Sequence, residues 1–377
     1  MLKYTVCQSR QVAAQSQDTT QVLQETNCRN GLCKKGFFMS NRTEISMNIP
    51  AEHQKNIFGD LDEHIKSIER TLSVDIIVRD DSVKVQGQTL NAARARKLLS
   101  QLLAKSERGE TVTTQNVTYA LSLFMDDMGD RLDSLDDDVI IHTMAGRPIK
   151  AKTLGQKSYV DSIRNKMITF GVGPAGTGKT YMAMAMAVRA FRKDEVSRII
   201  LTRPAIEAGE KLGFLPGDLQ SKIDPYLRPL YDALFEIMGP EAFQKNSEKG
   251  LIEVAPLAYM RGRTLDNAFI ILDEAQNTTP AQMKMFLTRI GFGTKVVITG
   301  DRTQKDLPRD QESGLDVSMK VLKKIDEIGF CELTSKDVVR HPLVQKIVQA
   351  YEVYEEKSKK NRPQNSGTRY QIKRRHS

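Results

Sequence analysis

The sequence predicts a mixed α/β protein, in which a mostly parallel β-sheet with helices on both faces follows a smaller N-terminal α/β module. The first observation is alternation: after Lys150, strand-like apolar runs are separated by helical patterns, the order that builds a parallel sheet. The second is a glycine-rich loop between one of these strands and a helix. The strand-like runs are Met167–Val172, Arg198–Thr202, Leu251–Val254, Phe269–Leu272, Lys295–Thr299 and Gly329–Leu333.

Composition agrees with a globular chain of more than one domain. The 377 residues are 40% hydrophobic and 27% charged, which excludes wholesale disorder, a collagen and a disulfide scaffold. No apolar run approaches the ~20 residues of a membrane helix, and the N-terminus has no secretory apolar region. We therefore expect a cytoplasmic protein with no membrane partner, whose four cysteines are reduced thiols.

The chain divides into five segments. Residues 1–45 are rich in Gln and Ser without a period, which predicts a disordered end or an overextended start. Residues 46–125 form the predicted α/β module, and the acidic residues 126–150 form a linker with a short strand. Residues 151–356 hold the predicted sheet. Residues 357–377 carry eight Lys and Arg and no acid, out of a net charge of +9. We expect a disordered tail that contacts nucleic acid, the alternative being a solubilising end.

The N-terminal module is predicted to combine helices with a β-hairpin. Residues 74–79 and 83–86 read as two short strands joined by a tight turn. Helical patterns follow over residues 92–102 and 114–128. Before the hairpin, apolar residues recur at three- and four-residue steps, which predicts one face of a single helix. These residues are Ile57, Leu61, Ile65, Ile68 and Leu72.

The strongest chemical signal is a phosphate-binding loop between the strand-like run that ends at Val172 and a helical pattern from Tyr181. Its glycines let backbone N–H groups converge on phosphates, and the helix N-terminus adds a positive dipole. We expect Lys179 to reach the β- and γ-phosphates of ATP and the Thr180 hydroxyl to bind Mg²⁺. The alternative, a glycine-rich turn that binds nothing, fits the strand–loop–helix context poorly. The loop is Gly173-Pro174-Ala175-Gly176-Thr177-Gly178-Lys179-Thr180.

Two adjacent carboxylates end another predicted strand, where Phe269–Leu272 runs into Asp273 and Glu274. Asp273 is expected to hold Mg²⁺ through water, as the partner of the phosphate loop. Glu274 can orient or deprotonate an attacking water, which favours hydrolysis as the reaction. The alternative is a strand end with two solvated acids.

Three further residues are weaker candidates. Gln304 follows the strand-like run over 295–299 and can contact the γ-phosphate or the attacking water, or belong to a capped turn. The carboxamide of Gln156 can both donate to and accept from the adenine edge, or lie on the surface. Arg340 precedes a predicted helix and can stabilise charge on a transferring phosphoryl group, or form a surface salt bridge.

Taken together, these motifs resemble the PhoH-like family, P-loop ATPases related to the core of superfamily 1 helicases. The resemblance covers about residues 50–356, and its most specific parts are the blocks Arg203–Gly217 and Asp224–Asp232 and the segment around Arg340. It implies a RecA-like P-loop NTPase core that uses ATP and Mg²⁺. It also implies a role in RNA metabolism or ribosomal RNA maturation, beside an endoribonuclease or a ribosome-associated partner. It assigns Gln156 to adenine, the Asp-Glu pair to hydrolysis, and Arg340 to a finger or sensor.

The N-terminal module resembles the KH-like domain expected in this family. A KH domain clamps phosphates with a Gly-x-x-Gly loop. The corresponding stretch here reads Gly59-Asp60-Leu61-Asp62. One glycine is absent and two carboxylates would repel a phosphate chain, so oligomerisation or docking is favoured over RNA binding for this module.

The sequence therefore predicts Mg²⁺-dependent ATP hydrolysis coupled to RNA binding or remodelling. One alternative is a P-loop kinase, which Glu274 opposes, and another is a nucleotide-switched scaffold that recruits an endoribonuclease. The 55 residues between Asp301 and the tail are too few for a second α/β domain of ~100 residues. We therefore expect a homo-oligomer, a hexameric ring by resemblance, with ATP at subunit junctions and Arg340 acting on the neighbouring subunit.

Overall fold

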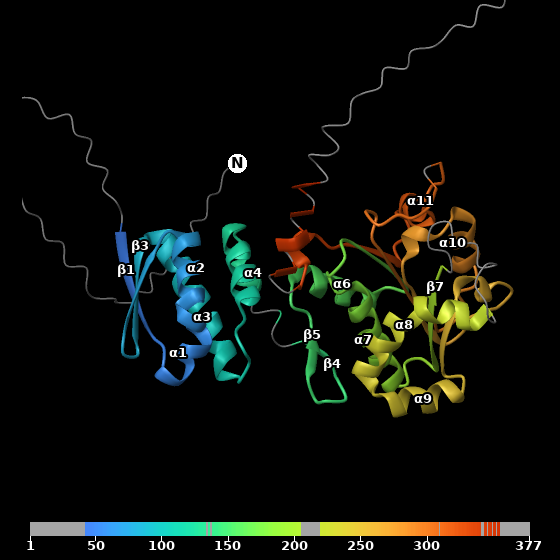
Figure 1. Cartoon of the computed structure of the whole chain (residues 1–377), viewed down its shortest axis with the longest axis horizontal. Helices are drawn as coiled ribbons and strands as arrows, with labels where there is room; N and C mark the ends of the chain where they lie inside the picture. The colour runs from blue at the N-terminus through green and yellow to red at the C-terminus, as the bar shows by residue number, and fades with distance from the viewer. Residues whose placement is uncertain are drawn as a thin grey trace, which may run out of the picture. The chain divides into compact units, whose positions relative to one another are not determined.

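The structure is a computed structural model that describes residues 42–132, 135, 138–204, 219–308 and 310–340 and positions 343, 344, 346–348, 350, 351, 353 and 354 (Figure 1). Residues 1–41, the basic tail and residues 205–218 of the family-specific block lie outside this range, so the predictions made for them stay predictions.

The N-terminal module is a three-stranded antiparallel sheet, of order β1-β3-β2, with helices packed on it. The order strand–helix–helix–strand–strand–helix makes this a small α/β module, as predicted, and its likeness to a KH domain stays a prediction. A further helix, α4, follows it. The elements are β1 (Arg42–Asn48), α1 (Ala51–Phe58), α2 (Glu63–Leu72), β2 (Asp75–Arg79), β3 (Ser82–Gln88), α3 (Thr89–Glu107) and α4 (Thr114–Met125).

Two features of this module differ from the sequence prediction. Strand β1 was not predicted, although it pairs with β3 along its whole length. The single helix predicted through Leu61 is wrong, because the chain leaves helical geometry at Gly59 (φ 75°) and again at Leu61 (φ 54°). Leu61 is 89% exposed and adds nothing to the core. The other apolar residues of the predicted stripe are buried, but on two helices, α1 and α2.

The larger domain is built on a six-stranded sheet of order β11-β6-β10-β9-β7-β8, in which all the described strand pairs are parallel. Each predicted strand is present, which confirms the RecA-like P-loop core. The strand that leads into the phosphate loop, β6, is separated by β10 from the strand that ends at the Asp-Glu pair, β9. The strands are β6 (Ile168–Val172), β7 (Arg198–Arg203), β8 (Ile252–Pro256), β9 (Ala268–Leu272), β10 (Lys295–Gly300) and β11 (Ile328–Glu332).

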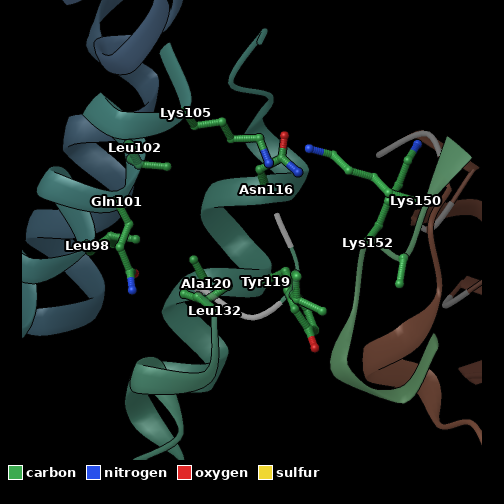
Figure 2. A pocket seen from close by; sticks show the side chains of 12 residues that line it. Leu98, Gln101, Leu102, Lys105, Asn116, Tyr119, Ala120, Leu132, Lys150 and Lys152 are labelled. Atoms are coloured by element: carbon green, nitrogen blue, oxygen red, sulfur yellow. The ribbon is translucent and has the colours of Figure 1, made fainter. Parts of the chain in front are cut away.

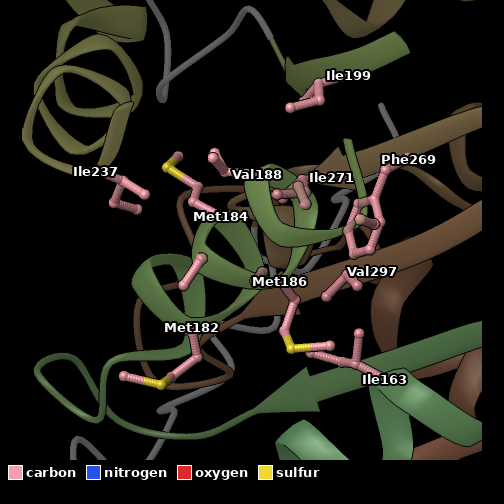
Figure 3. Packing of buried hydrophobic residues seen from close by; sticks show 14 of the residues in the cluster. Ile163, Met182, Met184, Met186, Val188, Ile199, Ile237, Phe269, Ile271 and Val297 are labelled. Atoms are coloured by element: carbon pink, nitrogen blue, oxygen red, sulfur yellow. The ribbon is translucent and has the colours of Figure 1, made fainter. Parts of the chain in front are cut away.

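Helices cover both faces of this sheet. Phe269 and Ile271 of β9 face the core that contains the buried Met182–Val188 stretch of α7, as Figure 3 shows for several of these residues. Ile270 of the same strand faces a second core with Met283 of α10. Among the described residues, no helix combines the length and apolarity needed to cross a membrane. The helices are α6 (Leu154–Asn165), α7 (Lys179–Arg192), α8 (Leu219–Met238), α9 (Pro240–Glu248), α10 (Pro280–Leu287) and α11 (Gly314–Val321).

A short hairpin, β4 (Val139–His142) and β5 (Pro148–Lys150), precedes α6. A cavity is lined by side chains of α3, α4 and this hairpin, and Figure 2 shows Lys150 and Lys152 on one side of it. The Lys150 ammonium lies 2.5 Å from the Glu110 carboxylate. None of the predicted nucleotide-site residues lines this cavity.

Two phenylalanines provide a matched test of the core. Phe269 is fully buried in β9, whereas Phe292, in the loop before β10, is 91% exposed. Phe269→Ala is expected to lower the free energy of unfolding by about 3–5 kcal/mol, because it removes apolar contacts and leaves a cavity. Phe292→Ala is expected to change it by less than about 0.5 kcal/mol. Urea unfolding followed by circular dichroism measures both, and similar losses for the two variants would contradict the described packing.

Candidate functional site

The phosphate loop joins β6 to α7, and two of its glycines are required by backbone geometry. Gly176 and Gly178 have φ of 84° and 77°, which side chains rarely adopt. A Cβ on Gly176 would also lie 2.7 Å from the Arg340 guanidinium. Helix α7 begins directly after the loop, at Lys179. The unpaired N–H groups of its first turn and the positive end of its dipole therefore form an anion site next to the loop.

Side chains from outside the loop hold its carbonyl oxygens. The Gln156 amide, from α6, donates to the carbonyl oxygen of Thr177 (3.0 Å). The Arg340 guanidinium donates to the carbonyl oxygen of Ala175 (2.8 Å). The backbone carbonyl groups of the loop are thus paired on the protein side, which fixes the loop in the shape of an anion cradle.

Lys179 contacts the beginning of the same loop. Its ammonium donates to the carbonyl oxygens of Gly173 (2.6 Å) and Pro174 (2.8 Å). Burial lowers the pKa of Lys179, while the carboxylates of Asp301 and Asp273 oppose this shift. A phosphate oxygen is a stronger acceptor than a carbonyl, so an arriving phosphate would compete for this ammonium.

Asp273 lies directly after β9 and is only 3% exposed. Its Oδ1 accepts hydrogen bonds from the Thr180 hydroxyl (2.7 Å) and the Thr299 hydroxyl (2.5 Å). These two threonines come from α7 and from β10. The carboxylate therefore connects the phosphate-loop helix to two strands of the sheet.

Arg203 covers the other oxygen of this carboxylate. Its Nε and Nη2 donate to Oδ2 of Asp273 (2.9 Å and 2.7 Å), and Nη2 lies 3.4 Å from Oε1 of Glu274. In the sequence, Arg203 belongs to a family-specific block for which no role could be predicted. The sequence indicates that an arginine ends one strand and that an aspartate follows another. It does not indicate that the two strands are neighbours in the sheet, so the pairing of the two residues could not be predicted.

Glu274 starts the turn after β9 in a left-handed backbone conformation (φ 54°). Its Oε2 accepts a hydrogen bond from the Gln276 amide (2.6 Å), which also donates to the backbone carbonyl of Gln304 (3.2 Å). Burial, followed by repulsion from the Asp273 carboxylate, raises the pKa of Glu274. A raised pKa improves a carboxylate as a proton acceptor near neutral pH.

The phosphate loop, Lys179 and the Asp-Glu pair line one open cavity of about 300 Å³, which also brings Gln304 together with them. Their chemistry fits a nucleotide with Mg²⁺: N–H groups and an ammonium suit phosphates, and hydroxyl and carboxylate oxygens suit the metal. The described residues contain no group of three or more His, Cys, Asp or Glu side chains arranged to hold a metal. Mg²⁺ commonly needs only one or two carboxylates beside phosphates and water. The lining includes Ala175, Gly176, Gly178, Lys179, Thr180, Asp273, Glu274, Asp301 and Gln304.

Gln156 is placed behind the phosphate loop rather than in this cavity. It is 2% exposed, and its Oε1 accepts a hydrogen bond from the backbone N–H of Lys152 (2.8 Å). Its Nε2 donates to the loop carbonyl of Thr177. The alternative of a surface glutamine is therefore wrong. The adenine contact stays a prediction.

Arg340 contacts the phosphate loop of its own chain. Besides the guanidinium contact with Ala175, the backbone N–H of Val339 donates to the carbonyl oxygen of Gly176 (3.0 Å). The carbonyl of Arg340 accepts from the Gln115 amide of α4 (3.3 Å). Arg340 is thus near enough to the loop to influence bound phosphates, and a contact to a neighbouring subunit stays a prediction.

A comparison with known protein families agrees with this site. The family model for "PhoH-like protein" matches residues 148–352, which contain the phosphate loop, the Asp-Glu pair and Arg340. The chain belongs to the PhoH-like family. This confirms the resemblance on which several of the sequence predictions depend, and the sheet described above gives the chain a P-loop NTPase fold.

Curated relatives extend the match over most of the chain. A PhoH-like protein of Mycobacterium tuberculosis is 53% identical over 312 residues, which cover 82% of this chain and 88% of the relative. A PhoH-like protein of Bacillus subtilis is 50% identical over 297 residues, covering 79% and 93%. Protein PhoH of Escherichia coli is 46% identical over 206 residues, covering 54% and 58%.

The position of Gln156 allows a test of whether its side chain supports the phosphate loop or contacts adenine. Gln156→Ala is expected to weaken nucleotide binding about fivefold, because losing one hydrogen bond to the loop costs ~1 kcal/mol. If the side chain only supports the loop, ATP and GTP are affected equally. Isothermal titration calorimetry with both nucleotides measures this. Gln244→Ala, on α9, removes a glutamine bonded to Glu248 and serves as the unaffected control. A loss confined to ATP would instead establish an adenine contact.

Proposed function

We propose that this protein is a Mg²⁺-dependent ATPase that acts on RNA or on an RNA–protein assembly. The observation that carries the proposal is the cavity in which Glu274 lies beside Lys179, Thr180 and Asp273. Family membership supports nucleotide use. The RNA part is supported by the basic tail, whose eight Lys and Arg suit phosphate neutralisation. Ribosomal RNA maturation, beside an endoribonuclease or a ribosome-associated partner, is the setting we propose for it.

Each residue has a distinct task in this proposal. The α7 N-terminus and Lys179 bind the phosphates and orient the terminal phosphoryl group. Thr180 and Asp273 would hold Mg²⁺, which neutralises charge on the phosphates when it is bound. Glu274, held by the Gln276 amide, orients the attacking water and accepts its proton. Gln304 lines the same cavity, which supports a role for it in orienting that water.

The Glu274 assignment has a direct test. Glu274→Gln keeps the size of the side chain and removes its charge, so ATP binding should stay within about twofold while hydrolysis falls roughly 100-fold or more. Release of inorganic phosphate and binding of a fluorescent ATP analogue measure the two properties. Lys179→Ala is the contrasting control, because it should lose nucleotide binding. Hydrolysis at the original rate in Glu274→Gln would contradict the role of this carboxylate.

The same assays separate the alternatives. A P-loop kinase would place the phosphate on a small acceptor instead of releasing it. A nucleotide-switched scaffold that recruits an endoribonuclease would hydrolyse ATP very slowly and without stimulation by RNA. Crosslinking of bound RNA in cells, with Glu274→Gln as the trapping variant, identifies the RNA that the proposal requires.

A homo-oligomeric ring, most simply a hexamer, is part of the same proposal, and Arg340 allows a test of it. The prediction that Arg340 acts on a neighbouring subunit implies that mixing Lys179→Ala subunits with Arg340→Ala subunits restores hydrolysis at junctions that pair an intact phosphate loop with an intact arginine. No recovery would show that Arg340 acts only on the phosphate loop of its own chain, which it contacts. Light scattering gives the mass of the assembly in the same samples, and a fully active monomer would contradict the ring.

A further inference from the structure

The position of Arg203 beside Asp273 is fixed by the sheet. Strands β7 and β9 are parallel neighbours, and Thr202 of β7 is level with Leu272 of β9. The backbone N–H of Asp273 donates to the carbonyl oxygen of Thr202 (2.9 Å), which extends the ladder by one step. Arg203 and Asp273 are therefore the next residues on two adjacent strands. Their pairing follows from the register and is not a chance contact of two long side chains.

The two oxygens of Asp273 have different partners. Oδ1 accepts from the hydroxyl of Thr180, and this hydroxyl can bind a metal through its lone pairs while it still donates its proton to Oδ1. Oδ2 is then the oxygen that remains for a water of hydrated Mg²⁺. Arg203 fills this position with two charge-assisted hydrogen bonds.

We propose that Arg203 is a positioning residue that competes with Mg²⁺ for Asp273, so that metal binding depends on the nucleotide. The inference deepens the proposed function and rests on it. The guanidinium neutralises the Asp-Glu pair, with its side chain only 15% exposed. A divalent cation that arrives alone must displace this charge and approach it closely, which opposes binding.

The nucleotide shifts the competition for Asp273 from Arg203 to the metal. Its phosphates provide oxygen ligands for the metal and offer the displaced guanidinium a new anionic partner. A ligand shifts an equilibrium between two states only when it binds them with different affinities. Here the two states are Arg203 paired with Asp273 and Arg203 released from it. The phosphates favour the released state, because only then do they pair with Arg203. The site is therefore expected to bind a divalent metal more tightly when the nucleotide is present than when the metal is alone.

The test measures metal binding without turnover. Mn²⁺ replaces Mg²⁺ as a paramagnetic probe, and electron paramagnetic resonance reports free Mn²⁺ during titration of the nucleotide-free, full-length protein. Arg203→Gln keeps a hydrogen-bond donor and removes the charge. It is expected to bind Mn²⁺ roughly tenfold more tightly than the wild type, because the competing cation is gone. Adding Asp273→Asn to this variant should abolish the gain, which places the metal at Asp273.

Arg263→Gln is the matched control. It removes a guanidinium that pairs with both oxygens of Glu253 (2.6 Å and 2.7 Å), and it lies outside the nucleotide cavity. Its Mn²⁺ affinity should equal that of the wild type.

Arg203→Lys, which keeps the charge, is used if thermal unfolding shows that Arg203→Gln does not fold, and its Mn²⁺ affinity should rise less than threefold. Unchanged or weaker Mn²⁺ binding by folded Arg203→Gln, or a rise of threefold or more in Arg203→Lys, would overturn the proposal. A wild type that does not hydrolyse ATP would contradict the proposed function without altering these affinities.

Discussion

The buried carboxylate of Asp273 is the interaction on which the site depends. A carboxylate with so little exposure is costly unless it is paired and hydrogen-bonded. Here the partners come from three different elements: a hydroxyl from α7, a hydroxyl from β10 and a guanidinium from β7. Because each partner stands at the carboxyl end of its strand or at the start of the following helix, the sheet order determines the chemistry of the cavity. Separating any of these elements would leave a buried charge without its partners.

The backbone of the phosphate loop is likewise held by partners from distant parts of the chain. Gln156 and Arg340 are more than 180 residues apart, yet both donate to carbonyl oxygens of one short loop. Paired carbonyl groups restrict the loop before any ligand arrives, and a preorganised cradle loses less entropy on binding. Gln156 and Arg340 can therefore improve anion binding by the loop without contacting the anion.

Much of the fold could be predicted from the sequence, because local pattern determines it. Alternating apolar runs located the six strands of the large sheet, and the glycine spacing located the loop. The break at Leu61 could not be predicted from periodicity, since an exposed leucine continues the three- and four-residue pattern by coincidence. The pairing of Arg203 with Asp273 depends on β7 lying next to β9, and the burial of Gln156 depends on α6 lying behind the loop. Both are properties of strand order and packing, which a single sequence does not contain.

The order of the strands also has a consequence for the synthesis of the chain. Strand β6 lies between β11 and β10, and β11 is the last of the six strands of this sheet along the sequence. Roughly 155 residues separate the emergence of β6 from that of β11. At ~5–20 residues per second, one edge of β6 therefore stays unpaired on the ribosome for roughly 8–30 s. An unpaired apolar edge invites pairing with other chains. Arg340 emerges later still, so a nascent chain acquires its complete nucleotide cradle only after all six strands of the large sheet have been synthesised.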